Sequence, residues 1–482
     1  MKRLLITNGK LVLRDSIVDG GLLCENGIIS DVGYIGDTPD DTELVDADGC
    51  YVLPGFIEPH AHGGGGYDFI DNTETAFDEI FKLHRAHGVT QLCPTLCACG
   101  EESMFEFLSL ASRLSDRAGF AGVHLEGPFL SPAMSGAQNR SRLLLPDERI
   151  IERLEYYKDI IARITAAPEL NGVDTLARRM KCAGVSMSIG HSNADAETAR
   201  RALRLGFDSV THLFCSTSGR TKYGGFVRGG IIEAALLDDD CYIELIGDGH
   251  HVSPESFRLA LKCRGADKIC VVSDAMRAAF EVVKLNNTDC RENAVSSGRH
   301  GCENTVAAPN AYPNLNTVSN AYSNLNTVSN AHPSFNAAPN AHPNLNNAPN
   351  ACPNLNNAPN TCPNLNNAPN AYSNLNTTST GESYLGAILP ENRVILEDGV
   401  AKLPDRTSFA GSLAVGDSMV ESLCQNYGLD LVTVSRMMSA APAALLGLTG
   451  RGQLRAGYHA DIVLLGKDYR TNAVFIDGKR VV

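Results

Sequence analysis

The stretch "ETAFDEIFKLHRAHGVTQLCPT", Glu74 to Thr95, contains the pattern that decides the fold. Its first part places Phe77, Ile80, Phe81 and His84 at the spacing of one helix face. A helix of this pattern ends at Gly88, and a β-rich run of residues follows directly. The stretch therefore predicts a helix that leads into a buried strand, which is one unit of an α/β fold.

The same unit recurs along the chain. The further copies are "SMFEFLSLASRLSDRAG" into "FAGVHLEGP", "TLARRMKCAG" into "VSMSIGHS", "AETARRALRLG" into "FDSVTHLF", and "FRLALKCRGADK" into "ICVVSDA". Helices that alternate with buried strands indicate a parallel sheet covered by helices. A barrel with an attached smaller domain would use most of the 482 residues.

Polar residues follow four of these strands directly: Glu126, His191, His212 and Asp274. His60 and His62 follow the apolar run "CYVLPGFI" in the same way. The carboxyl ends of barrel strands are where α/β barrels keep their chemistry, so we expect these side chains to converge on one face. Imidazole and carboxylate together suit a transition metal.

Each of these residues also has an ordinary structural reading. Glu126 before a Gly-Pro turn could be a capping or solvated carboxylate, and Asp274 could be an N-cap for "AMRAAFEVV". His84 and His87 lie on a helix and are interpreted as structural, and so is His250. His124 alternates with Glu126 and is expected to line the site without binding metal.

The two ends of the chain differ from its middle. They alternate apolar and polar residues and contain Asn-Gly and Asp-Gly turns, which is typical of β-hairpins. We therefore predict a small β-sandwich domain from residues 1–53 and 449–482, and a barrel over residues 54–448.

Between Asn310 and Ser379 the sequence repeats with a period of ten, as in "NAHPNLNNAP" and "NACPNLNNAP". No Asp, Glu, Lys or Arg occurs from Asn304 to Gly381. One Leu or Phe per repeat offers too little apolar surface to offset roughly 1–2 kcal/mol of backbone ordering per residue. We predict a disordered insertion over residues 288–380, with an asparagine-ladder solenoid as the alternative.

Composition excludes several classes of protein. Hydrophobic residues make up 43% of the chain, and no apolar run is long enough to span a membrane. The net charge of −14 argues against nucleic-acid binding. The 15 cysteines have no paired spacing, which favours free thiols and, with an N-terminus unlike a signal peptide, a cytoplasmic location.

Seven strings occur in an order that resembles the N-acetylglucosamine-6-phosphate deacetylase family of the amidohydrolase superfamily. They are "PGFIEPHAHG", "GVHLEGPFLSP", "SIGHSNA", "VTHLF", "DGHHV", "VSDAM" and "FAGSL". The resemblance covers nearly all of the chain except the insertion. It implies a TIM-type (β/α)8 barrel with a small β-sandwich domain and a zinc- or iron-dependent hydrolase that releases acetate from an N-acetyl amino sugar phosphate.

The resemblance also implies roles for individual residues. Glu126, His191 and His212 match the ligands of the main metal, and His60 and His62 match the pair that in some members binds a second ion. Asp274 matches the catalytic acid and base. The matching substrate positions are Ala137, Gln138, Cys215, Ser216, Arg228, Asp248, His251, Phe409, Ala410 and Gly411.

The chain departs from the family at several of these positions. Cys215 and Ser216 stand where members usually have Asn-Ala, and "GAQ" at Gln138 replaces "GAH". One arginine in the family meets the substrate phosphate; Arg228 is nearest to its position, with Arg220 and Lys222 as alternates. These departures leave a related N-acyl amino sugar open as the substrate. The family also suggests a homodimer in which a neighbouring subunit helps to bind phosphate.

Two other functions compete with this one. A deaminase or cyclic amidase would share the histidines and the aspartate, but many of those enzymes use a carbamylated lysine where this chain has Glu126. A non-catalytic scaffold whose insertion binds partners would be expected to lose ligands, and all five ligands are present.

Overall fold

The computed structural model describes residues 3–34, 36, 38, 40–279 and 381–482. The insertion predicted at 288–380 lies outside these residues, and its disorder stays a prediction. Among the described helices, none combines the length and apolar character that a membrane crossing requires. Every described cysteine is a free thiol.

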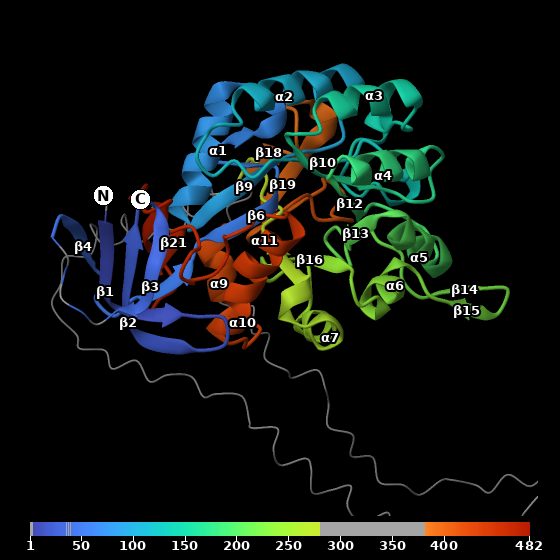
Figure 1. Cartoon of the computed structure of the whole chain (residues 1–482). Helices are drawn as coiled ribbons and strands as arrows, with labels where there is room; N and C mark the ends of the chain where they lie inside the picture. Colours follow the sequence, from blue (N-terminus) through green and yellow to red (C-terminus); the bar gives the residue numbers. More distant parts are fainter. Residues whose placement is uncertain (1–2, 35, 37, 39, 280–380) are drawn as a thin grey trace, which may run out of the picture. The chain divides into compact units, whose positions relative to one another are not determined.

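Eight parallel strands form the central sheet (Figure 1). In sheet order they are β17 (Ile269–Val272), β16 (Tyr242–Ile246), β13 (Phe207–Val210), β12 (Ser186–Ile189), β11 (Ile161–Ala166), β10 (Val123–Glu126), β9 (Val89–Leu96) and β6 (Phe56–Ala61). The strand order follows the chain order, as in a (β/α)8 barrel. The fold class expected from the repeated units is therefore confirmed.

Contacts between β17 and β6 close the barrel. The backbone N–H of Asp274 donates to the carbonyl of His60 at 3.0 Å, and that of His62 donates to the carbonyl of Ala275 at 2.8 Å. The buried carboxylate of Glu58 also bridges the seam, because it accepts from the backbone N–H groups of His60 at 3.0 Å and Ser273 at 2.9 Å. The closing bonds thus lie at the residues that the sequence predicts to be functional.

Helices connect the strands and cover the barrel. They are α1 (Glu74–Ala86), α2 (Glu101–Arg113), α3 (Glu148–Tyr156), α4 (Val173–Cys182), α5 (Ala196–Leu205), α6 (Ile231–Leu237), α7 (Pro254–Arg264), α9 (Gly416–Gln425), α10 (Leu431–Ser435) and α11 (Ala441–Leu445). Side-chain caps start several of them: Thr73 accepts from Ala76 N, and Asp195 from Thr198 N. The apolar face of α1, including Phe77 and Ile80, is fully buried in the barrel core.

A β-domain is built from both ends of the chain (Figure 1). Its strands are β1 (Arg3–Val12), β2 (Ile17–Glu25), β3 (Ile28–Tyr34), β4 (Thr42–Asp46) and β5 (Tyr51–Pro54) with β21 (Ile462–Leu465), β22 (Thr471–Ile476) and β23 (Lys479–Arg480). β1 pairs with β4 near its start and with β5 near its end. A separate apolar core, with Ile6 and Phe475 at its centre, holds this domain together.

A small antiparallel sheet follows the insertion: β18 (Gly381–Tyr384), β19 (Arg393–Glu397) and β20 (Val400–Lys402). The guanidinium of Arg277 binds Asp71 at 2.6 and 3.0 Å and donates to the carbonyl of Gly386 at 3.1 Å. The side chain of Asp68 accepts from Gly386 N at 3.2 Å. The chain before and after the insertion is therefore held together by the loop that follows β6.

Candidate metal centre and active site

Six buried side chains meet at the carboxyl end of the barrel: His60, His62, Glu126, His191, His212 and Asp274. They form two groups of possible metal ligands, one of His60, His62 and Asp274 and the other of Glu126, His191 and His212. In each group the ligand atoms lie within 4.8 Å of one another. The convergence expected from the strand ends is thus present in the structure.

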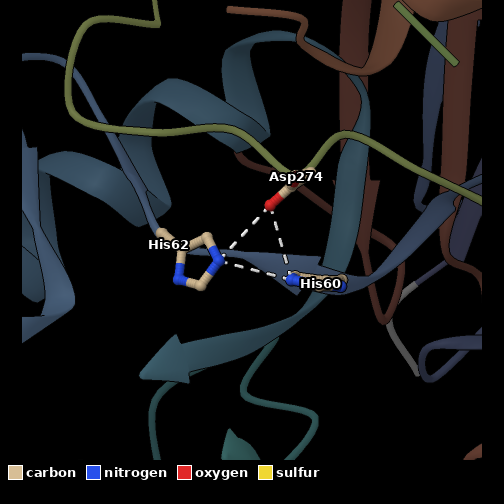
Figure 2. A group of neighbouring side chains, drawn as sticks. All are labelled: His60, His62 and Asp274. Atoms are coloured by element: carbon tan, nitrogen blue, oxygen red, sulfur yellow. Dashed lines mark hydrogen bonds and ion pairs between the residues drawn. The ribbon is translucent and has the colours of Figure 1, made fainter. Parts of the chain in front are cut away.

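The first group is drawn in Figure 2, where Asp274 points toward both histidines. Its Oδ1 lies 3.4 Å from His60 Nε2 and 3.3 Å from His62 Nε2. The two Nε2 atoms are 3.3 Å apart. Two ring nitrogens at this separation need a proton or a cation between them, because two lone pairs would repel each other.

Glu126 faces both groups. Its Oε1 lies 3.1 Å from His191 Nε2 and 2.8 Å from His212 Nε2, and its Oε2 lies 3.2 Å from His62 Nε2. Gln138 donates from Nε2 to the same Oε2, and its Oε1 accepts from Ala98 N at 2.8 Å. This places Gln138 against a predicted metal ligand, a contact that the sequence comparison with the family does not suggest.

The ligands have electrostatic properties that suit a divalent metal. Burial lowers the pKa of His60 to about 3, so its ring is neutral and can offer a lone pair. Burial opposes ionisation of Glu126, but its contacts with His191 and His212 outweigh burial and hold the pKa of this carboxyl well below its usual value. Burial opposes protonation of His62 and His212, but Asp274 and Glu126 outweigh it and raise the pKa of both rings, so a metal ion bound there would displace a proton. Imidazoles and ionised carboxylates are the donor set of zinc and iron sites.

Hydrogen bonds fix the orientation of three rings. His191 Nδ1 lies 3.0 Å from the carbonyl of Met134, and His212 Nδ1 lies 3.2 Å from the carbonyl of Cys215. His60 Nδ1 faces the carboxylate of Glu244 at 3.2 Å. Because carbonyl and carboxylate oxygens only accept, each Nδ1 carries a proton, which leaves Nε2 as the nitrogen that can bind a metal ion at the centre.

Three of the ligands have left-handed backbone conformations two residues after the ends of their strands. The φ angles are 45° at His191, 29° at His212 and 50° at Asp274. L-residues rarely adopt this region, at a cost of about 1–2 kcal/mol each. The turn that aims these side chains inward is therefore strained at each strand end.

A pocket opens above the centre, and its residues come from several loops. It is lined by His62, Glu126, Gly136, Ala137, Gln138, His191, His212, Cys215, Ser216, Ile246, His251, Asp274, Leu385, Ser408, Phe409 and Gly411. Most predicted substrate residues therefore lie at this pocket. Gly136, Leu385 and Ser408 were not predicted, because short loop positions carry no periodic signal, and Ile246 was not predicted because it is the apolar last residue of β16.

His251 is held against the pocket wall by two neighbours. Its Nδ1 lies 2.7 Å from Asp248 Oδ2, and its ring centroid lies 4.8 Å from that of Phe409. Burial opposes ionisation of Asp248, but His251 and backbone N–H groups lower the pKa of this carboxyl to about 2. An anionic Asp248 behind the ring fixes His251 with its Nε2 free for a ligand.

Several other predicted residues lie outside the pocket. Arg228 is exposed on β15 (Phe226–Arg228), which pairs with β14 (Thr221–Tyr223) in a hairpin that extends from the barrel in Figure 1. Ala410 and His60 are fully buried and do not line the pocket. His124 does not line the pocket: it is buried beneath, with Nε2 2.8 Å from Thr165 Oγ1.

Two histidines that the sequence analysis interprets as structural, His84 and His87, make structural contacts. His84 Nε2 lies 3.1 Å from the carbonyl of Gly63, and His87 Nδ1 lies 2.8 Å from Asp417 Oδ1. Asp274 is followed by a turn over residues 277–279, and the rest of the helix that it was considered to cap lies outside the described residues. Its carboxylate faces the histidines.

Known proteins resemble the chain in sequence and in fold. An amidohydrolase family model matches residues 393–481. An N-acetylglucosamine-6-phosphate deacetylase of Bos taurus is 30% identical over 293 residues, which is 57% of this chain and 68% of the relative. An N-acetylgalactosamine-6-phosphate deacetylase of Shewanella is 33% identical over 231 residues, covering 47% of this chain and 57% of the relative. The alignments with the curated relatives thus span about two thirds of their length or less.

Solved structures support the fold. A Mycobacterium smegmatis N-acetyl-D-glucosamine-6-phosphate deacetylase, studied as a mutant with N-acetyl-D-glucosamine-6-phosphate, has a TM-score of 0.73 at 23% identity, and the match covers 100% of both chains. Barrel, terminal β-domain and the cluster of histidines and carboxylates define an amidohydrolase. Within that class, the chain belongs to the N-acetylglucosamine-6-phosphate deacetylase family.

Proposed function

We propose that the protein removes the acetyl group from an N-acetyl amino sugar phosphate, most simply N-acetylglucosamine 6-phosphate, to give glucosamine 6-phosphate and acetate. The observation that carries this proposal is the convergence of Glu126, His191 and His212 beside Asp274 at the floor of one pocket. The names of the curated relatives support the same activity.

Glu126, His191 and His212 would hold the main metal ion, and His60, His62 and Asp274 would hold a second. We propose zinc or iron, one or two ions per chain, from the nitrogen and oxygen donors. When bound, such an ion lowers the pKa of a water molecule and polarises the amide carbonyl.

Asp274 would carry the proton. Burial opposes its ionisation, but the contact with His62 outweighs burial and keeps the pKa of this carboxyl below its usual value, so it is ionised near neutral pH. Its carboxylate can take the proton of the attacking water and return it to the sugar nitrogen as the C–N bond breaks. His251 and Gln138 would position the sugar and its acetamido group.

The phosphate needs a cation that this pocket does not supply. In the part of the chain that the structure describes, no lysine or arginine lines the pocket. Arg228 is on a hairpin that exposes Phe226 by 73% and Val227 by 54%. We propose a homodimer in which this hairpin packs against a second copy and places Arg228, or Arg220 or Lys222, near its phosphate site.

The corresponding N-acetylgalactosamine 6-phosphate is the second candidate. The Shewanella relative is named for that activity, and Cys215 and Ser216 change the pocket wall.

We also propose that the domains divide as predicted from the sequence, at residues 53/54 and 448/449, and that the protein acts in the cytoplasm.

The test is an assay of acetate release from N-acetylglucosamine and N-acetylgalactosamine, each with and without a 6-phosphate. We expect the phosphorylated glucosamine derivative to have the highest kcat/KM. Arg228→Ala should raise KM for phosphorylated sugars only, and Arg200→Ala on α5 is the matched exposed control. No acetate release from any of the four sugars by metal-loaded protein would refute the function, and equal effects on both substrate types would remove Arg228 from the phosphate site.

A further inference from the structure

An ion pair is buried inside the barrel, beneath the metal centre. Arg163 on β11 donates from Nη1 to Oε1 of Glu244 on β16, and both side chains are fully buried. Among the described residues, the Nε and Nη2 atoms of Arg163 have no hydrogen-bond partner. Barrel interiors are normally filled with branched apolar side chains, and burying two charges costs several kcal/mol per ion. Stability alone is therefore a poor explanation for this pair.

The other oxygen of Glu244 reaches the metal ligands. Its Oε2 lies 3.2 Å from His60 Nδ1 and 3.3 Å from the backbone nitrogen of His212. One carboxylate thus contacts a ligand from each group. Its position is fixed from below by Arg163.

This arrangement decides which nitrogen of His60 carries a proton. An ionised carboxylate has no proton to donate, so His60 Nδ1 must be the donor. The Nε2 lone pair then faces His62 and Asp274, where a cation would lie. His191 and His212 use backbone carbonyls for the same purpose, and His62 Nδ1 has no partner in the described part of the chain. His60 is therefore the ring in its group that a charged side chain anchors.

We propose that Glu244, held by Arg163, is a positioning residue that makes His60 a metal ligand through Nε2 and so sets the metal affinity of the group His60, His62 and Asp274. The inference rests on the proposed function only in requiring that the protein bind a metal ion. Carboxylates behind a histidine ligand typically contribute 10- to 100-fold to metal affinity.

Glu244→Gln gives a sharp test because Arg163 fixes the orientation of the new amide. Arg163 can only donate, so the amide oxygen must face it and the NH₂ group must face His60 Nδ1. His60 would then carry its proton on Nε2, against the metal. We expect Zn²⁺ titration of the metal-free variant, followed with a chelating dye, to show a 10- to 100-fold loss of affinity for one ion.

The double variant Arg163→Met with Glu244→Gln should restore part of that affinity. Without the arginine, the amide can turn its oxygen toward His60 and accept from Nδ1 again. A double variant that binds Zn²⁺ no better than Glu244→Gln would contradict the tautomer argument.

A second double variant, Arg163→Met with Glu244→Met, separates positioning from stability. A buried ion pair replaced by apolar residues is often neutral or stabilising, so we expect an unchanged or higher melting temperature with weakened Zn²⁺ binding. Parent-like Zn²⁺ affinity, or failure of this variant to fold, would overturn the proposal. A parent protein that binds neither Zn²⁺ nor Fe²⁺ would refute the proposed function instead.

Discussion

Deletion of Thr288 to Thr380 is expected to stabilise the protein and leave its site intact. Arg277, three residues after Asp274, donates to the carbonyl of Gly386 at 3.1 Å, so the described chain on the two sides of the insertion is already held together. The deletion shortens the connection between Ala279 and Gly381 from 101 residues to eight. Eight residues can still span up to about 30 Å when extended.

The expected gain follows from the entropy of closing the loop, if the insertion is as flexible as its sequence predicts. Each doubling of loop length costs about 0.6 kcal/mol, so shortening by a factor of about 13 should contribute roughly 2 kcal/mol. With an unfolding entropy of about 2.1 cal/mol/K per residue over the remaining chain, the melting temperature should rise by about 3 °C.

Calorimetry and Zn²⁺ titration check this prediction, together with acetate release. The matched control replaces the deleted segment by a Gly/Ser linker of equal length, which should melt like the parent because only length matters. We expect kcat and metal affinity of both variants within a few-fold of the parent. Loss of folding or activity in the deletion variant, with the linker variant also impaired, would show that the repeat sequence itself supports the structure or the site.

Three further predictions concern single residues. His191→Ala should lower the bound metal by about one ion per chain in metal analysis, because it removes a ligand 3.1 Å from Glu126; unchanged content would exclude His191 as a ligand. Asp274→Asn should lower kcat by about 10²- to 10⁴-fold in the acetate assay with the ion at Glu126, His191 and His212 retained, and a loss below tenfold would contradict a general acid/base role. Arg277→Met should lower the free energy of unfolding, measured in denaturant, by about 2–4 kcal/mol, because it leaves Asp71 and two backbone carbonyls without their donor. The control Lys82→Met removes only an exposed contact to Glu79 and should change the free energy of unfolding by less than about 0.5 kcal/mol.

The fold could be predicted from the sequence because its units are local. The apolar spacing in α1 and the glycine after it place helix and strand in one short stretch, and four more copies repeat the pattern. Ligands directly after strands, such as His191 and His212, could then be placed on one face without knowing any distance. The small sheet β18–β20 was not predicted as such, because short antiparallel strands after the insertion have weak periodicity.

Glu244 and Arg163 were missed because their roles depend on pairing across the barrel. A signal was present: each is a single charged residue within an apolar run, "YIELI" and "IARIT". In a parallel strand covered on both faces, such a residue is expected to pair with an opposite charge, because burying an unpaired charge is costly. The contact between Gln138 and Glu126 has no comparable signal, since it depends on the path of a loop.

The left-handed backbone at His191, His212 and Asp274 has a consequence for laboratory evolution. Glycine adopts this conformation without strain, so replacing any of the three ligands by glycine should release part of the local cost while destroying the centre. A library sorted only for soluble expression or heat resistance should therefore accumulate glycine at these positions. The same library sorted for growth on an acetylated sugar as sole carbon source should retain the ligands. The difference between the two sorted libraries would show, at three positions, where stability and catalysis favour different residues.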